Sequence, residues 1–161
     1  MRNVERGFSL IELLIVVAII LIIAAIAIPD LMHSKMSANH ASAIQSLRVI
    51  NSAEVMYASN YQKGYSSSLQ NLKAPTGGAQ PSATAAALID DVLGSAMKSG
   101  YRFTYAPNTP DANGYYQGYT VNADPVSPGT SGGVYYYTDQ SYVIRFKNSG
   151  PATSTDQPLS K

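Results

Sequence analysis

The feature that most constrains this chain is an apolar run near its N-terminus, from Phe8 to Ile28, which holds a single charged residue, Glu12. As an α-helix that rises about 1.5 Å per residue, the run is roughly 31 Å long, which matches the hydrocarbon core of a bilayer. A carboxylate within such a helix costs on the order of 2.5–3.5 kcal/mol at mid-depth and less near an end. Glu12 lies close to one end, so we expect it to need a partner, and none is evident elsewhere in the sequence.

The residues before the run set the expected orientation of this helix. Arg2 and Arg6 outweigh Glu5, and this excess of positive charge predicts that the N-terminus stays in the cytoplasm while the rest of the chain crosses the membrane. An alternative is a secretory signal peptide cleaved after Ala27, because residues 25–27 form an A-x-A sequence. We favour a retained helix, because the run is longer than the apolar core of a signal peptide and carries a carboxylate.

The sequence Gly-Phe-Ser-Leu-Ile-Glu at residues 7–12 lies between a short charged leader and the apolar run. It resembles the processing motif of type IV pilins and their relatives, the pseudopilins. The resemblance implies that a prepilin peptidase cuts between Gly7 and Phe8 and then methylates the new N-terminus. It also implies that Glu12 meets the α-amine of a neighbouring subunit during filament assembly. The detailed resemblance ends near Tyr61.

The chemistry expected of Glu12 is electrostatic. Cleavage after Gly7 creates an α-amine whose pKa is about 7.7–8.0, so it is largely protonated at neutral pH. In an apolar setting this cation and a carboxylate attract strongly, although desolvation offsets much of the gain. We therefore predict that Glu12 sets the register between subunits, the alternative being a carboxylate that extends to the lipid headgroups. Ser9 is expected to cap backbone N–H groups at the start of the helix.

Composition narrows the function classes. The chain has 161 residues, a net charge of +1 and no cysteine, which suits one domain plus an anchor and excludes disulfides. The balanced charge gives no basic field, so nucleic acid is not favoured as a partner, although it stays open. We predict no cofactor, no metal and no enzymatic activity. The reason is that no histidine follows His40 and no nucleophile or phosphate-binding motif is evident.

Residues 29–62 are predicted to continue the helix in amphipathic form. Pro29 removes one backbone hydrogen bond, and we favour a kinked continuous helix over a helix stop there. His40 and Glu54 interrupt the apolar face, and the spacing of His33 and His40 does not suit a metal pair. The face needs a partner, and the downstream sheet is the expected one. Its apolar members are Met32, Met36, Ala43, Leu47, Ile50, Tyr57 and Tyr61.

Residues 63–100 are predicted to form a variable segment with one short helix over residues 85–98. Asp90 and Asp91 are adjacent on that helix, so their side chains point about 100° apart and suit a solvated face better than a catalytic pair. The resemblance implies that this segment faces outward from a filament.

Residues 101–147 show the alternation of an antiparallel sheet with three or four strands, and Asn113-Gly114 predicts a hairpin turn. The sequence from Asp111 to Gly114 also looks like a fragment of a calcium loop, but the remaining ligands are missing, so we predict a turn. Major pseudopilins typically carry a C-terminal calcium site. The resemblance therefore favours a pilus subunit here.

Most of the 12 tyrosines fall in the C-terminal half, where we expect packed rings with hydroxyl groups in water. Residues 148–161 are rich in Ser, Thr, Pro and Gly and predict an extended or disordered tail.

Together these patterns predict an α+β fold, the pilin fold. A leader (residues 1–7) precedes a long helix that spans the membrane in its first half (residues 8–28) and packs on an antiparallel sheet of three or four strands. The resemblance implies a structural subunit of a type IV pilus, held in the bacterial inner membrane as a precursor and displayed at the cell surface after assembly. Its implied partners are further copies, a prepilin peptidase, an inner-membrane assembly platform with its ATPase, and membrane lipid. Two alternatives stay open: a type II secretion pseudopilin, and a membrane-anchored binding head that does not polymerise.

Overall fold

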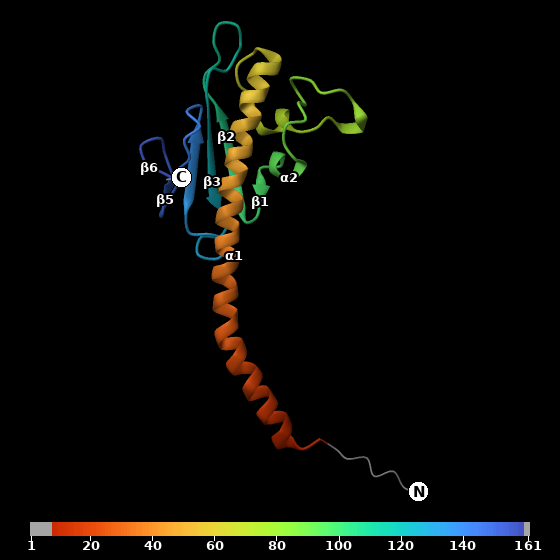
Figure 1. Cartoon of the computed structure of the whole chain (residues 1–161), viewed down its shortest axis with the longest axis vertical. Coiled ribbons are helices and arrows are strands. Elements are labelled where there is room, and N and C mark those ends of the chain that lie inside the picture. The colour runs from red at the N-terminus through yellow and green to blue at the C-terminus, as the bar shows by residue number, and fades with distance from the viewer. Residues whose placement is uncertain (1–7, 160–161) are drawn as a thin grey trace. The chain divides into compact units, whose positions relative to one another are not determined.

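The computed structural model describes residues 8–159. The chain divides into two compact units, Met1–Lys35 and Met36–Lys161, and each is described by itself. The helix α1 (Leu10–Tyr61) begins in the first unit and ends in the second (Figure 1). It continues through Pro29, so the alternative of a helix stop at Pro29 is wrong. The predicted kink at Pro29 stays a prediction.

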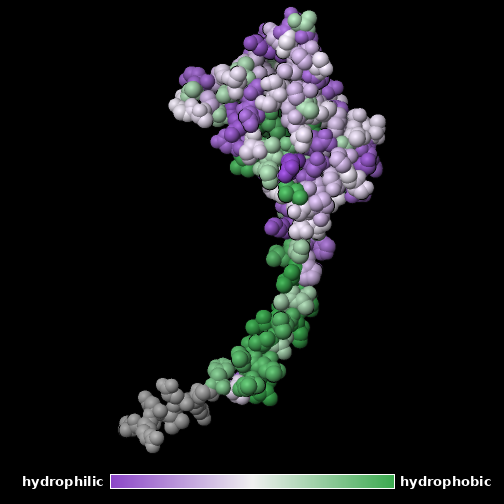
Figure 2. Space-filling model, turned by 180° about the vertical axis from the view of Figure 1, so that it is seen from behind, coloured by the Kyte–Doolittle hydropathy of each residue, from purple (hydrophilic) through white to green (hydrophobic). Residues whose placement is uncertain are grey.

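The described part of the first unit is mostly the N-terminal, apolar part of α1. By length and composition this helix could cross a membrane, and its most apolar window is 0% buried. The space-filling view shows an almost unbroken hydrophobic surface along this segment (Figure 2). Since so much exposed apolar surface is unfavourable in water, the segment needs a cover of lipid or protein.

The second unit holds an antiparallel sheet of six strands in sequential order. This confirms the predicted α+β fold, whereas the predicted strand number of three or four is wrong. Two edge strands of two residues each lie outside residues 101–147, and a pair of residues is too short to show an alternating pattern. The strands are β1 (Met97–Lys98), β2 (Tyr101–Pro107), β3 (Tyr119–Pro125), β4 (Tyr135–Asp139), β5 (Arg145–Lys147) and β6 (Gln157–Pro158).

The predicted turn at Asn113-Gly114 is present within the connection between β2 and β3. The Gly114 N–H donates to the Asp111 carbonyl at 2.9 Å, and the Asp111 N–H donates to the Tyr115 carbonyl at 2.9 Å. The strands themselves end at Pro107 and begin again at Tyr119, so the turn tips a longer loop rather than closing a tight hairpin.

The predicted helix over residues 85–98 is wrong. Only α2 (Asp91–Gly94) is α-helical there, and the 3-10 helices η1 (Leu69–Leu72) and η2 (Thr76–Gly78) precede it. Residues 86–89 instead hydrogen-bond to the η1 region: Ala86 N–H donates to the Asn71 carbonyl at 2.8 Å and Leu88 N–H to the Leu72 carbonyl at 2.7 Å. Tertiary pairing therefore overrides the helical periodicity of this stretch.

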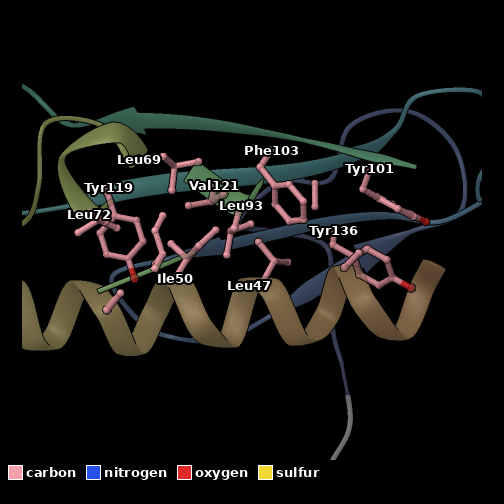
Figure 3. Packing of buried hydrophobic residues seen from close by; sticks show 14 of the residues in the cluster. Leu47, Ile50, Leu69, Leu72, Leu93, Tyr101, Phe103, Tyr119, Val121 and Tyr136 are labelled. Carbon is pink, nitrogen blue, oxygen red and sulfur yellow. The ribbon is translucent and has the colours of Figure 1, made fainter. Parts of the chain in front are cut away.

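The core of the second unit lies between one side of α1 and one face of the sheet. In Figure 3 the side chains of Leu47 and Ile50 point from the helix toward Phe103 and Val121. Leu47, Ile50 and Val121 are each 0% exposed and Phe103 is 2% exposed, so this contact is fully dry. Burying such side chains stabilises the fold by about 1.5–3 kcal/mol each. The predicted packing of helix on sheet is confirmed.

The C-terminal segment through Leu159 lies along the sheet, so of the two predicted alternatives the extended tail is confirmed and the disordered one is wrong. Ala152 is 2% exposed, and its carbonyl accepts a hydrogen bond from Asn122 Nδ2 at 2.7 Å. An Arg145 guanidinium nitrogen donates to the Asp156 carbonyl at 2.9 Å, just before β6 pairs with β5. Side chains from β3 and β5 therefore bind the backbone of this segment. The polar composition of the segment gives no sign of these contacts.

We expect Leu47→Ala to lower the free energy of unfolding of the second unit by about 2–5 kcal/mol, because the cavity is closed on every side. The matched control is Met56→Ala on the same helix, where the side chain is 52% exposed and the change should stay within about 0.5 kcal/mol. Denaturant unfolding of the full chain in detergent, followed by near-ultraviolet circular dichroism of the tyrosines, measures both. Equal losses in the two variants would contradict the described core.

Candidate functional site

The start of α1 gathers three of the residues that the motif singled out. Phe8 and Ser9 precede the helix, and Glu12 lies in its first turn. The Ser9 backbone N–H donates to Glu12 Oε2 at 3.0 Å, and the Leu13 N–H donates to the Ser9 carbonyl at 3.2 Å. This is the carboxylate half of a capping box, with Ser9 as N-cap and Glu12 three residues later. Glu12 thus has a local partner that the sequence analysis missed.

That partner is a neutral donor, so it does not remove the negative charge of Glu12. The side chains around it are apolar and open: Phe8 is 83% exposed and Leu10 is 80% exposed. Gly7 and the rest of the leader, on which cleavage was predicted, lie outside the described residues. The geometry therefore presents a capped helix start with one carboxylate on an otherwise apolar surface.

The second unit contains a buried carboxylate, Glu54, on the sheet-facing side of α1. Its side chain is 0% exposed, and its oxygens accept the Ser66 backbone N–H at 2.9 Å and the Ser66 hydroxyl at 2.5 Å. The Tyr105 hydroxyl donates to the Ser66 carbonyl at 2.8 Å. Burial raises the pKa of Glu54 above its ordinary value, and the Ser66 hydrogen bonds oppose that shift. Glu54 thereby binds the chain that follows α1 to the helix itself.

Asn51 forms a second buried polar contact, one turn before Glu54. Its Nδ2 donates to Thr138 Oγ1 at 2.9 Å, and its Oδ1 accepts the Tyr119 hydroxyl at 2.9 Å. Both donor and acceptor groups of this amide are therefore satisfied by β3 and β4.

His40 forms a third contact, with its Nδ1 3.0 Å from the hydroxyl oxygens of Tyr101 and Tyr136. The Gly133 N–H donates to His40 Nε2 at 3.4 Å, which assigns the proton of the neutral ring to Nδ1. The Tyr101 hydroxyl in turn donates to the Val134 carbonyl at 2.8 Å, so its oxygen can accept from Nδ1. Burial lowers the pKa of His40, which favours this neutral form.

His40 and Glu54 looked like interruptions of an apolar face, but they belong to its buried side. They lie seven residues before and seven residues after the buried Leu47, which places all three in one column of the helix. That seven-residue spacing was the signal in the sequence that His40 and Glu54 are on the buried side. The spacing does not show which residues they bind. The tyrosine hydroxyls also differ from the prediction, because those of Tyr101 and Tyr119 bind protein groups rather than water.

The remaining candidate residues are bound within their own loops. The Asp111 carboxylate accepts the N–H groups of Asn113 at 2.8 Å and Tyr115 at 3.0 Å, in an Asx-type turn. Asp90 caps α2 by accepting the Leu93 N–H at 2.8 Å. Within residues 8–159 no group of three His, Asp or Glu side chains is placed to hold a metal ion.

Comparison with known proteins bears on the N-terminal part of the chain. Residues 2–28 match the family model described as the prokaryotic N-terminal methylation motif. A relative from Pectobacterium carotovorum subsp. carotovorum, named type II secretion system core protein G, is 34% identical over 70 residues. The match covers 44% of this chain and 44% of the relative, so this chain spans less than half of the length of that protein. No solved structure matches.

The matched model defines a class of prokaryotic proteins that carry an N-terminal methylation motif. Taken with the secretion-system relative and the α+β fold, it supports a place for this chain in the type IV pilin and pseudopilin family. The resemblance seen in residues 7–12 is thereby confirmed, and members of this family are structural subunits. The motif and the apolar helix also support membrane anchoring of a precursor.

The buried Glu54 generates a test of pH dependence. Because its folded-state pKa is raised, the unfolded state loses its proton first, and the free energy of unfolding should fall as pH rises through and above the ordinary value of about 4.5. Glu54→Gln removes this titration and should flatten the fall between that value and the raised pKa. Denaturant midpoints of both chains across pH 4 to 8, in one detergent, measure the difference.

The control is Glu54→Ala, which leaves the Ser66 N–H and hydroxyl without their acceptor and should lose about 1–3 kcal/mol at every pH. If wild type and Glu54→Gln show parallel pH profiles, the raised pKa of Glu54 is wrong.

Proposed function

We propose that this chain is a structural subunit of a helical filament, cut after Gly7 and polymerised through α1. The observation that carries the proposal is the apolar half of α1, which opens with the methylation motif and is 0% buried in its most apolar window. In the precursor, lipid covers this surface. In the filament, parallel copies of the same helix replace the lipid, since one apolar cover can substitute for another.

The proposed role of Glu12 is to fix the register of these copies. It is the charged residue of the apolar run, and its local hydrogen bond to Ser9 leaves its negative charge uncompensated. The protonated α-amine of Phe8 in a neighbouring copy supplies the missing cation after cleavage. The copies would slide freely if their contacts were apolar alone, whereas a required ion pair selects one axial offset.

The partners follow from this assembly. We propose further copies of the chain, a prepilin peptidase, an inner-membrane platform and its ATPase. The subunit would leave the inner membrane for a surface pilus, and it would have no enzymatic role. The turn at Asp111 favours a pilus over a pseudopilus. Its carboxylate accepts N–H groups of its own loop, which suits a turn better than a calcium ligand.

The second candidate is a pseudopilin of type II secretion. The observation that favours it is the relative named as a core protein of that system, which is similar over 70 residues. Both candidates need cleavage, methylation and polymerisation. They differ in where the filament lies and in what fails when it is lost.

Deletion of the gene distinguishes the two. Loss of surface filaments, with the chain found by mass spectrometry in filaments sheared from wild-type cells, supports the pilus. Loss of secretion of folded enzymes without loss of surface filaments supports the pseudopilus. A deletion that affects neither, with a chain that stays monomeric in the membrane, supports the anchored binding head instead.

We expect Glu12→Ala to enter the membrane normally and to reduce filament yield at least several-fold, because the helix keeps its apolar length but loses the carboxylate that pairs with the amine. Membrane fractionation and quantified filaments in sheared fractions measure the two effects. Glu12→Asp is the matched control, since it keeps the charge on a shorter side chain and should recover part of the yield. Wild-type yield from Glu12→Ala would overturn the role of Glu12.

Intact mass and N-terminal sequencing of filament subunits test the cleavage itself. A mature chain that begins with methylated Phe8 is expected. A subunit that still carries Met1 to Gly7, or one that begins at Ile28, contradicts the proposal.

A further inference from the structure

The outer edge of β2 is only partly covered by its neighbour β1. The two strands pair through Met97 with Arg102 and through Lys98 with Tyr101, and the Phe103 N–H then donates to the Ala96 carbonyl at 2.8 Å. β2 continues to Pro107, well past the end of this pairing (Figure 1). No described strand pairs with this edge beyond Phe103.

Three backbone groups of Phe103 and Tyr105 face that open edge. In an antiparallel sheet the N–H and C=O of alternate residues point to the same side, and Phe103 points toward β1. Tyr105, two residues on, therefore directs both its N–H and its C=O to the open edge. The Phe103 carbonyl is unpaired as well, because the Ala96 N–H opposite it donates to the Leu93 carbonyl at 2.9 Å. Such a row of unpaired groups is a template for an added strand.

The edge lies in a groove of about 530 Å³, which we call the β2-edge groove. Residues 68–70, 94–96 and 102–105 line it. Its volume is enough for a few residues of an extended segment beside β2.

The charge of the groove selects the occupant. Arg102 is the charged residue among those that line it, and it makes no ion pair in the part of the chain that the structure describes. Its cross-strand neighbour Asp124 does not pair with it. An extended segment with a carboxylate beside Arg102 would complement this charge.

A second copy of this chain does not offer such a segment within residues 8–159. Asp90, Asp111 and Asp156 are bound by N–H groups of their own loops. The other described carboxylates lie in helices or strands, as do Glu12 and Asp124. The described part of the chain therefore offers no such segment, and we take another protein as the source.

We propose that the β2-edge groove docks an extended acidic segment of another protein, added as a strand to β2. The segment donates to the Phe103 and Tyr105 carbonyls and accepts the Tyr105 N–H, while its carboxylate pairs with Arg102. This mode supplies affinity through the main chain and specificity through the charge. The groove is lined by residues of the second unit alone, so it does not involve the apolar half of α1 through which the chain is proposed to polymerise.

The test uses the full chain in detergent micelles and three fluorescein-labelled peptides, TVDVEVT, TVKVKVT and TVDPEVT. The acidic peptide should bind, and the basic and proline-containing peptides should bind roughly tenfold more weakly or worse, by fluorescence anisotropy. Bound acidic peptide should also slow hydrogen exchange of the Tyr105 amide by roughly tenfold or more. Failure of the acidic peptide to bind, or equal binding of the basic peptide, overturns the proposal.

Two matched variants locate the site. Gln70 lines the groove and is exposed, so Gln70→Trp should block it and weaken the acidic peptide by roughly tenfold. Gln80 is also exposed but lies outside the groove, so Gln80→Trp should keep the affinity within about twofold. Arg102→Glu should reverse the preference toward the basic peptide. Unchanged binding by Gln70→Trp, in a chain with wild-type circular dichroism, would overturn the assignment to this groove.

Discussion

One helix, α1, has to satisfy two different surroundings, and this constraint governs the rest of the structure. Its backbone groups are paired within the helix, so the same geometry is stable in lipid, in a protein bundle and against a sheet. What changes along α1 is the side chains: apart from Glu12 they are uncharged and mostly apolar as far as Ile28, and in the second unit one side of the helix is buried. The first half therefore needs neighbours that the single chain does not supply, whereas the second half finds them in its own sheet.

The polar residues on the buried side of α1 specify how the second half sits on that sheet. His40 binds tyrosines of β2 and β4, Asn51 binds β3 and β4, and Glu54 binds Ser66 just beyond the helix. Each of these polar groups costs about 1–3 kcal/mol if it is buried without its hydrogen-bond partner. Sliding the helix by one turn would remove the partners of all three residues at once, and the costs would add. Leu47 and Ile50 supply the apolar contact, but apolar contacts alone tolerate such shifts better. The register of α1 on the sheet thus comes from its polar residues.

The sequence predicted the parts of the fold that rest on local pattern. The apolar length of residues 8–28, the stripe around Leu47 and the turn at Asn113-Gly114 each need only neighbouring residues to be recognised. Distant contacts decide the parts that the sequence mistook or left open. Residues 86–89 pair with η1 instead of forming a helix, and the tail, extended rather than disordered, is held at Ala152 by Asn122 from β3. The two carboxylates Glu12 and Glu54 show the same difference between local pattern and distant contact. The motif around Glu12 is local, whereas the acceptor role of Glu54 depends on Ser66, whose approach only the folded chain shows.

The local hydrogen bond of Glu12 makes its proposed intersubunit role more specific rather than weaker. The Ser9 N–H fixes one carboxylate oxygen at the start of the helix, so the charge is held in a defined place before any neighbour arrives. A second charge at 4 Å gains about 4 kcal/mol at an effective dielectric constant near 20, and desolvation of the two ions takes back an amount of similar size. The net stabilisation of a correctly paired subunit is therefore small. A subunit in the wrong register keeps the desolvation cost and loses the attraction, so in its proposed role the carboxylate would act mainly by penalising misplaced neighbours. In the proposed filament, the exposed apolar surface of α1 would supply the adhesion, and Glu12 would select among the arrangements that this adhesion allows.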